Sequence, residues 1–165
     1  MAAASELRRA AKSLVERAPL SIVSHYSAQD SAARLTALIR EGRLEPSLVA
    51  EATADGVSMR RASGETVLAA SWKPDESGAR LEGEFFPSVG TQRLLKLVSA
   101  FLGVLVLMAG WVLVQDGPAP LKVATGLFAA LSILAFPLFV AGLASQRAAR
   151  EATIARAMRR ALTRE

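Results

Sequence analysis

The fold of this chain is decided by LLKLVSAFLGVLVLMAGWVLV at residues 94–114 and by VATGLFAALSILAFPLFVAGLA at residues 123–144. The first stretch holds one charged residue, Lys96, and the second holds none. Because a helix rises about 1.5 Å per residue, each stretch spans roughly 31–33 Å and matches the ~30 Å hydrocarbon core of a bilayer. We therefore predict two transmembrane helices; the alternative is a pair of buried core helices in a soluble protein.

The connection between the two stretches, residues 115–122, predicts a tight turn. Gly117, Pro118 and Pro120 end one helix before the next begins. So short a link leaves the two helices as antiparallel neighbours. We expect a transmembrane hairpin over residues 91–146.

Basic residues predict how this hairpin is oriented. Arg93 lies just before the first span and Lys96 at its start. Six arginines follow the second span, whereas the turn contains a single basic residue, Lys122. Lys and Arg near span ends stay on the cytoplasmic side. We expect a multi-pass protein of the cell inner (cytoplasmic) membrane with both termini in the cytoplasm, and residues 1–18 lack the pattern of a signal peptide.

The net charge of +5 comes mostly from the C-terminal tail. Residues 1–93 hold 12 basic and 12 acidic side chains, whereas residues 145–165 hold six basic and two acidic ones. A neutral N-terminal region does not favour nucleic-acid binding. The absence of cysteine fits a cytoplasmic location.

The region before the spans predicts an α+β fold. Residues 1–18 form an amphipathic helix, centred on 5–17, that lies on anionic lipid or on a partner. The alternatives are a frayed, Ala-rich extension and a helix packed on its own domain. Residues 19–90 form a small cytoplasmic domain with the order β-α-β-β-β-β, an antiparallel sheet with one packed helix. The predicted elements are a strand at 20–26, a helix at 28–41 and strands at 48–53, 57–61, 66–72 and 80–85.

Local signals support these elements. Ser27 and Asp30 form a capping box before the helix, and Asp55-Gly56 is a two-residue turn signal. Residues 80–85 alternate between charged and apolar, residues 73–78 have the composition of a loop, and residues 46–53 have a helical alternative. A core within residues 20–86 is marginal alone, so we expect it to lean on a second copy, the N-terminal helix or the bilayer.

The tail, residues 147–165, predicts a basic amphipathic helix that contacts a membrane surface. Its apolar face carries Ile154, Met158 and Leu162, and its basic face carries Arg156, Arg159, Arg160 and Arg164. The alternatives are a plain extension of the second span and a coiled coil with a partner.

The sequence contains no pattern that indicates catalysis. His25 is the single histidine and there is no cysteine, so a zinc or haem site is not expected, and no nucleotide-binding or nucleophile motif occurs. We predict no catalytic, cofactor-binding or metal-binding residues and no enzyme activity. Within the spans, Ser99 and Gly103 and also Gly126 and Ala130 have the small-x-x-x-small spacing that permits close helix packing.

Two motifs carry a resemblance to a known group of proteins. SAQD at residues 27–30 and GARLEGEFFP at residues 78–87 resemble segments of uncharacterised bacterial inner-membrane proteins, in which a small cytoplasmic α+β domain precedes a transmembrane helical hairpin. The resemblance covers about residues 20–115. It implies this architecture and no activity or site residue.

These observations lead to three hypotheses about function. The first is a non-enzymatic assembly, scaffold or accessory subunit that binds a protein partner, or another copy of itself, through its cytoplasmic domain. The second is a lipid-binding or membrane-remodelling protein that uses its basic amphipathic helices. The third is a small-molecule-binding membrane sensor with a cavity between helix and sheet.

Overall fold

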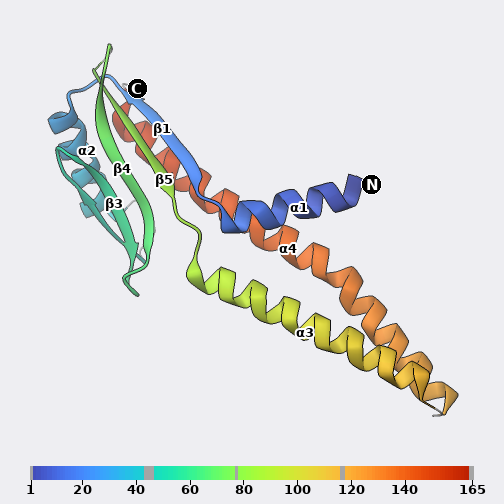
Figure 1. The fold of residues 1–165 in the computed structure, drawn as a ribbon. Helices are drawn as coiled ribbons and strands as arrows, with labels where there is room; N and C mark the ends of the chain where they lie inside the picture. Colours follow the sequence, from blue (N-terminus) through green and yellow to red (C-terminus); the bar gives the residue numbers. More distant parts are fainter. Residues whose placement is uncertain (1, 43–46, 77, 116–117, 164–165) are drawn as a thin grey trace. The chain divides into compact units, whose positions relative to one another are not determined.

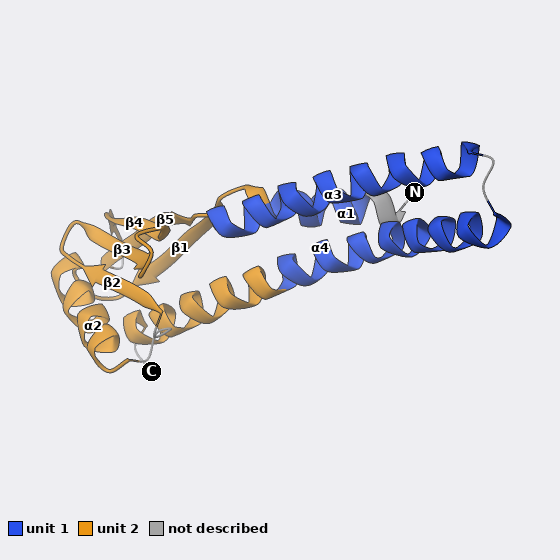
Figure 2. Cartoon of the chain, turned by 90° about the horizontal axis from the view of Figure 1, so that it is seen from below, with its two compact units in different colours: residues 1–14, 89–145 blue, residues 15–88, 146–165 orange. Residues whose placement is uncertain are grey.

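The computed structural model describes residues 2–42, 47–76, 78–115 and 118–163 (Figure 1). Their order of elements is α1 (Ala2–Val15), β1 (Ala18–Ser24), α2 (Ala28–Arg40), β2 (Leu48–Ala52), β3 (Gly56–Arg61), β4 (Thr66–Asp75), β5 (Gly78–Phe85), α3 (Val89–Val114) and α4 (Ala119–Leu162). The chain divides into two compact units (Figure 2). One unit consists of Met1–Leu14 and Val89–Ser145. The other consists of Val15–Ser88 and Gln146–Glu165, and we call it the domain.

The domain has the predicted β-α-β-β-β-β order. Its five strands form one antiparallel sheet in the order β1-β5-β4-β3-β2. Ser27 caps the start of α2, where its hydroxyl oxygen accepts a hydrogen bond from the Asp30 backbone N–H at 3.2 Å. The Asp30 carboxylate accepts from the Ser27 hydroxyl at 2.7 Å, which differs from the reciprocal backbone bond of a capping box. The helical alternative for residues 46–53 is wrong, because Leu48–Ala52 pairs with β3 as a strand, while Pro46 lies outside the described residues.

Alternation along the strands gives the sheet one apolar face. In β5, Leu81 and Phe85 are fully buried, whereas the Arg80, Glu82 and Glu84 side chains point to the opposite face. Leu20 and Ile22 of β1 and Val57 and Met59 of β3 follow the same pattern and join one buried cluster. We call the opposite side of the sheet the open face.

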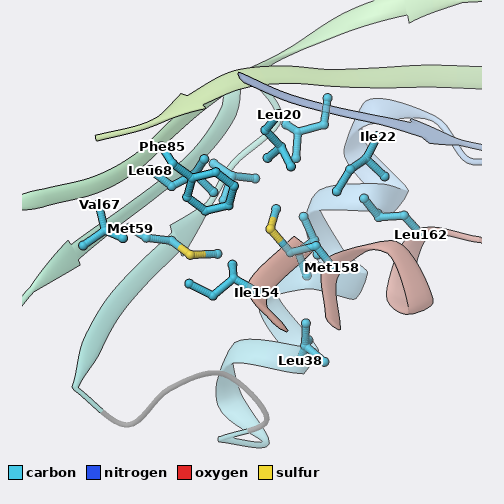
Figure 3. Close-up of a cluster of buried hydrophobic side chains, with 13 residues drawn as sticks. Leu20, Ile22, Leu38, Met59, Val67, Leu68, Phe85, Ile154, Met158 and Leu162 are labelled. Atoms are coloured by element: carbon cyan, nitrogen blue, oxygen red, sulfur yellow. The ribbon is translucent and has the colours of Figure 1, made fainter. Parts of the chain in front are cut away.

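Two helices supply the other half of the core, where the sequence predicted one. Leu35 and Leu38 of α2 pack into the cluster, as expected. Ile154, Met158 and Leu162 of α4 pack into it as well (Figure 3). The C-terminal tail therefore completes the small core. The sequence predicted a second copy, the N-terminal helix or the bilayer for this role, but not the tail.

Strand β4 is longer than predicted. It continues through Pro74 to Asp75, where the composition predicted a loop over residues 73–78. The pairing of β3 with β4 ends at Gly56 and Ser71, and the Trp72 backbone N–H still donates to the Asp55 carbonyl oxygen. Beyond Trp72, the strand pairing of β4 continues with β5 alone among the described residues. Proline is tolerated in a strand where one side of the sheet is free, because no ladder hydrogen bond is lost there.

The other unit contains the two apolar helices. α3 and the first part of α4 run antiparallel, as the hairpin prediction required (Figure 2). Asp116 and Gly117 of the predicted turn lie outside the described residues. Pro137 lies inside α4, as expected for a proline in the second apolar stretch.

α4 does not end with the apolar stretch. It is one helix of 44 residues whose last part belongs to the domain. Residues 145–162 contain no glycine or proline and many strong helix formers, and Arg147 pairs with Glu151 one turn on at 2.6 Å. Of the alternatives for the tail, the structure therefore has the extension of the second apolar helix.

Candidate functional site: an exposed apolar hairpin and a basic helical face

The apolar side chains of α3 and the first part of α4 are exposed. Both helices are long and apolar enough to cross a membrane, with a mean hydropathy of 2.5 and 2.3 over the most apolar 18 residues. Only 6% and 11% of those residues are buried within the chain. Leu107 and Leu138, for example, are 75% and 76% exposed. The alternative of two core helices does not fit, because a core helix buries most of its apolar side chains.

The small residues predicted to pack the two helices together do not do so within this chain. Ser99, Gly103 and Ala130 are exposed and Gly126 is half-buried. A Cβ atom built on either glycine meets no atom of a neighbouring segment within 4 Å. The most buried residues of the two apolar helices are instead Ala109, Ala129 and Val140. Within one chain, these four residues therefore do not make the close helix–helix contacts that the sequence predicted.

The apolar face of the tail is also not where the sequence predicted it. Ile154, Met158 and Leu162 are at most 3% exposed, because they fill the space between the sheet and α2. They are not available to a membrane surface while the domain is folded. The correction has a simple reason: an amphipathic helix needs an apolar cover, and the sheet of its own chain provides one.

Buried hydroxyl groups hold the end of this helix. The Ser24 and Ser31 hydroxyl oxygens lie 2.7 Å apart, and Ser24 Oγ donates to the Leu162 carbonyl oxygen at 3.4 Å. The Tyr26 backbone N–H donates to Ser24 Oγ at 3.2 Å. This network joins β1, α2 and α4, so its role is structural.

On the open face of the sheet, Lys73 and Arg80 form ion pairs. Lys73 Nζ lies 2.5 Å from Glu82 Oε2, and Arg80 Nη2 lies 2.7 Å from Asp75 Oδ1. The hydrogen bond from Lys73 to the Glu82 carboxylate, together with the lysine charge, holds the pKa of Glu82 below its usual range. These ion pairs leave the open face with little net charge.

The cations on the helical side of the domain are not paired in the same way. We define the basic helical face as Arg34 of α2 with Arg156, Arg159 and Arg160 of α4. All four side chains are exposed, and none forms an ion pair with a carboxylate among the residues that the structure describes. The basic face predicted for the tail is thus present, although Arg164 lies outside the described residues.

A groove opens between the two helices of this face. It has a volume of about 370 Å³ and is lined by Arg34, Ala37, Leu38 and Glu41 of α2 and by Ala157, Arg160 and Ala161 of α4. The Arg34 guanidinium lies over the Tyr26 ring, 3.8 Å from its centroid. Sequence reasoning missed Arg34 and Tyr26, because a single arginine on the polar side of a helix has no pattern that separates it from a solvated charge.

Other potentially reactive groups are not arranged as a catalytic site in the part of the chain that is described. Ser24 is fully buried, whereas its neighbour His25 is exposed. Among the described residues, no three His, Asp or Glu side chains gather where they could hold a metal ion. The groove on the basic helical face is therefore the candidate binding site.

Comparison with known proteins identified no relative of this chain. No family model matches the chain, and no similar protein was found among curated sequences or among solved structures. The resemblance to bacterial inner-membrane proteins stays a prediction.

Proposed function

We infer that this chain is a two-span protein of the bacterial inner membrane that holds a small non-enzymatic domain at the cytoplasmic surface. The exposed apolar side chains of α3 and the first part of α4 carry this proposal. In water such a surface is unfavourable by about 25 cal/mol for each Å² of apolar area, and lipid removes that cost. No charged residue occurs from Leu97 to Val114 in α3 or from Val123 to Ala144 in α4, so neither stretch places a charge in the hydrocarbon core.

The orientation can be tested directly because the chain has no native cysteine. We place single cysteines at Gln115, beside the turn between the helices, and at Ser63, in the turn between β3 and β4. A membrane-impermeant maleimide should label Gln115→Cys in intact spheroplasts and Ser63→Cys only after permeabilisation. Labelling of Ser63→Cys in intact spheroplasts would overturn the orientation, and release of the chain by alkaline carbonate would overturn membrane insertion.

The role of the domain is to bind a protein partner, as an assembly, scaffold or accessory subunit. The open face of the sheet supports this role because neither helix covers it and its charges are largely neutralised by one another. Val49 and Arg60 are opposite each other in the pairing of β2 and β3, and Val49 is 66% exposed. An exposed apolar residue beside an arginine is typical of protein interfaces.

Co-purification in mild detergent tests this role. A partner recovered with the native chain should be lost from a Val49→Lys/Arg60→Glu variant and retained by an Arg156→Gln variant, which changes the opposite side of the domain. All three substitutions are on exposed side chains, so the fold should survive. Recovery of the chain alone, or equal recovery of the partner with both variants, would count against the open face as the binding surface.

The lipid-binding hypothesis and the small-molecule sensor hypothesis have less support. A membrane-surface role for the tail needs Ile154, Met158 and Leu162 at the lipid, and all three are buried in the domain. A sensor with a cavity between helix and sheet needs empty space where the core cluster of 13 buried side chains is packed. Partner binding is therefore the hypothesis that agrees best with where these side chains lie.

A further inference from the structure

We propose that the groove between α2 and the C-terminal part of α4 binds a hydroxylated phosphate monoester. This site lies on the helical side of the domain, away from the open face. The proposal therefore does not depend on partner binding. It rests on the charge, the fixed geometry and the space within the groove.

The charge of the groove comes from two helices. Arg34 belongs to α2 and Arg160 to α4, and both line the same space. Neither arginine forms an ion pair with a carboxylate in the described part of the chain, unlike Arg61, which pairs with Glu65 at 2.7 Å. Arg34 and Arg160 thus both line one groove, and guanidinium groups offer the donor geometry that phosphate oxygens accept in bidentate fashion.

One of the two arginines is held in place before any ligand arrives. Its guanidinium stacks on the ring of Tyr26 at 3.8 Å, and the Tyr26 backbone is fixed by its hydrogen bond to the buried Ser24 hydroxyl. Stacking uses the face of the guanidinium and leaves the N–H groups at its edge available. A pre-ordered donor loses less conformational freedom when it binds an anion, so its affinity is higher.

The rest of the groove leaves room for more than a phosphate ion. Its lining includes three small side chains, Ala37, Ala157 and Ala161, and its volume is about 370 Å³. Glu41 also lines the groove. A carboxylate disfavours a second anionic group, and its two oxygens have lone pairs enough to accept hydrogen bonds from the hydroxyl groups of a ligand. This combination fits a phosphate attached to a hydroxylated carbon skeleton better than it fits a polyanion.

Phosphate monoesters occur both as soluble metabolites and as lipid headgroups. Both sources present the same phosphate group to Arg34 and Arg160.

Equilibrium dialysis of the full chain in nanodiscs of uncharged lipid tests the proposal, with glucose 6-phosphate as the probe and glucose as its uncharged counterpart. The native chain should bind the phosphate ester and not glucose. Arg34→Gln and Arg160→Gln should each weaken binding by about tenfold or more, as expected for loss of a charge-assisted contact. Tyr26→Leu should weaken it less, because the charge of Arg34 remains while its position is lost.

Arg60→Gln is the matched control, because Arg60 is an exposed arginine of the same domain on the open face. It should leave the affinity within about twofold of the native value, since its charge is outside the groove. Equal weakening by Arg60→Gln and Arg34→Gln would show non-specific attraction and overturn the site. Absence of saturable binding by the native chain would overturn it as well.

A second arm uses nanodiscs that contain phosphatidate. Unchanged binding of glucose 6-phosphate in these discs supports a soluble ligand in the groove. Competition by phosphatidate that is lost in the Arg34→Gln variant supports the same groove with a headgroup as its ligand. Competition that persists in Arg34→Gln, together with unaltered affinity for glucose 6-phosphate in that variant, would overturn the assignment.

Discussion

The hydroxyl groups of Ser24 and Ser31 form a hydrogen bond of 2.7 Å between β1 and α2, and both side chains are fully buried. Removing the Ser31 hydroxyl deletes this hydrogen bond, while Ser24 Oγ keeps its hydrogen bonds with the Leu162 carbonyl oxygen and the Tyr26 backbone N–H. The net contribution of one such bond is about 0.5–1.5 kcal/mol. We expect Ser31→Ala to lower the free energy of unfolding of the domain by this amount. Urea unfolding followed by Trp72 fluorescence, in a Trp111→Phe background, measures it.

Ser21→Ala serves as the control for this experiment, because Ser21 is exposed on the same strand as Ser24. Its effect should stay within about 0.5 kcal/mol, as for most surface substitutions. Equal stability of Ser31→Ala and the native chain would mean that the buried hydroxyl pair contributes nothing to the fold.

Met158 provides a prediction about the tail. Its side chain is fully buried between the sheet and α2, so Met158→Ala leaves a cavity in the core. A substitution of this kind costs about 2–5 kcal/mol. The same urea experiment should give a lower midpoint for Met158→Ala, whereas Arg159→Ala, at the next and exposed position, should change the midpoint little.

Gly83 provides a prediction about the sheet. A Cβ atom at this position would lie 2.2 Å from the Ala69 carbonyl oxygen and 2.4 Å from the Ala70 Cβ atom. Both contacts are far shorter than van der Waals distance, so Gly83→Ala must shift β4 against β5, at a cost of about 1–3 kcal/mol. The same substitution at Gly103, where a Cβ atom meets nothing within 4 Å, should leave the unfolding of the domain unchanged.

Glu82 provides a prediction about pH. Its pKa lies below the ordinary 4.5 because Lys73 donates a hydrogen bond to the carboxylate and adds a positive charge. A carboxyl group with a lowered pKa stabilises the folded state above its unfolded pKa, and this contribution is lost as the pH falls through the folded pKa. Lys73→Met should raise the pKa of Glu82, which carboxyl carbon NMR measures. A titration curve of Glu82 that is identical in the native chain and in Lys73→Met would contradict this assignment.

Much of the domain could be predicted from local patterns. The alternation of Leu81, Gly83 and Phe85 with charged residues predicts β5, and Ser27 with Asp30 predicts the start of α2; both are confirmed. Such patterns succeed because each depends on residues that are close in the sequence. Pro74 misled the prediction because its tolerance in β4 depends on where β3 ends, which is a property of the assembled sheet.

The location of the tail could not be predicted in this way. The apolar positions of the tail predict that one face of the helix is covered. They do not indicate whether lipid, a partner or the domain of the same chain covers it. Ile154 and Leu20 are 134 positions apart, and no local signal connects them. For the same reason the groove of Arg34 and Arg160 became visible only when both helices had been placed on the sheet.

The position of α4 in the sequence also determines when the domain can finish folding during synthesis. The five strands leave the ribosome first, then both apolar helices, and only afterwards Ile154, Met158 and Leu162. Until residues 154–162 have been made, the new sheet lacks one of the two helices that cover its apolar face. Maturation of the domain therefore follows that of the hairpin, and a ribosome that stalls after Ser145 leaves a nascent chain whose sheet is uncovered on that side.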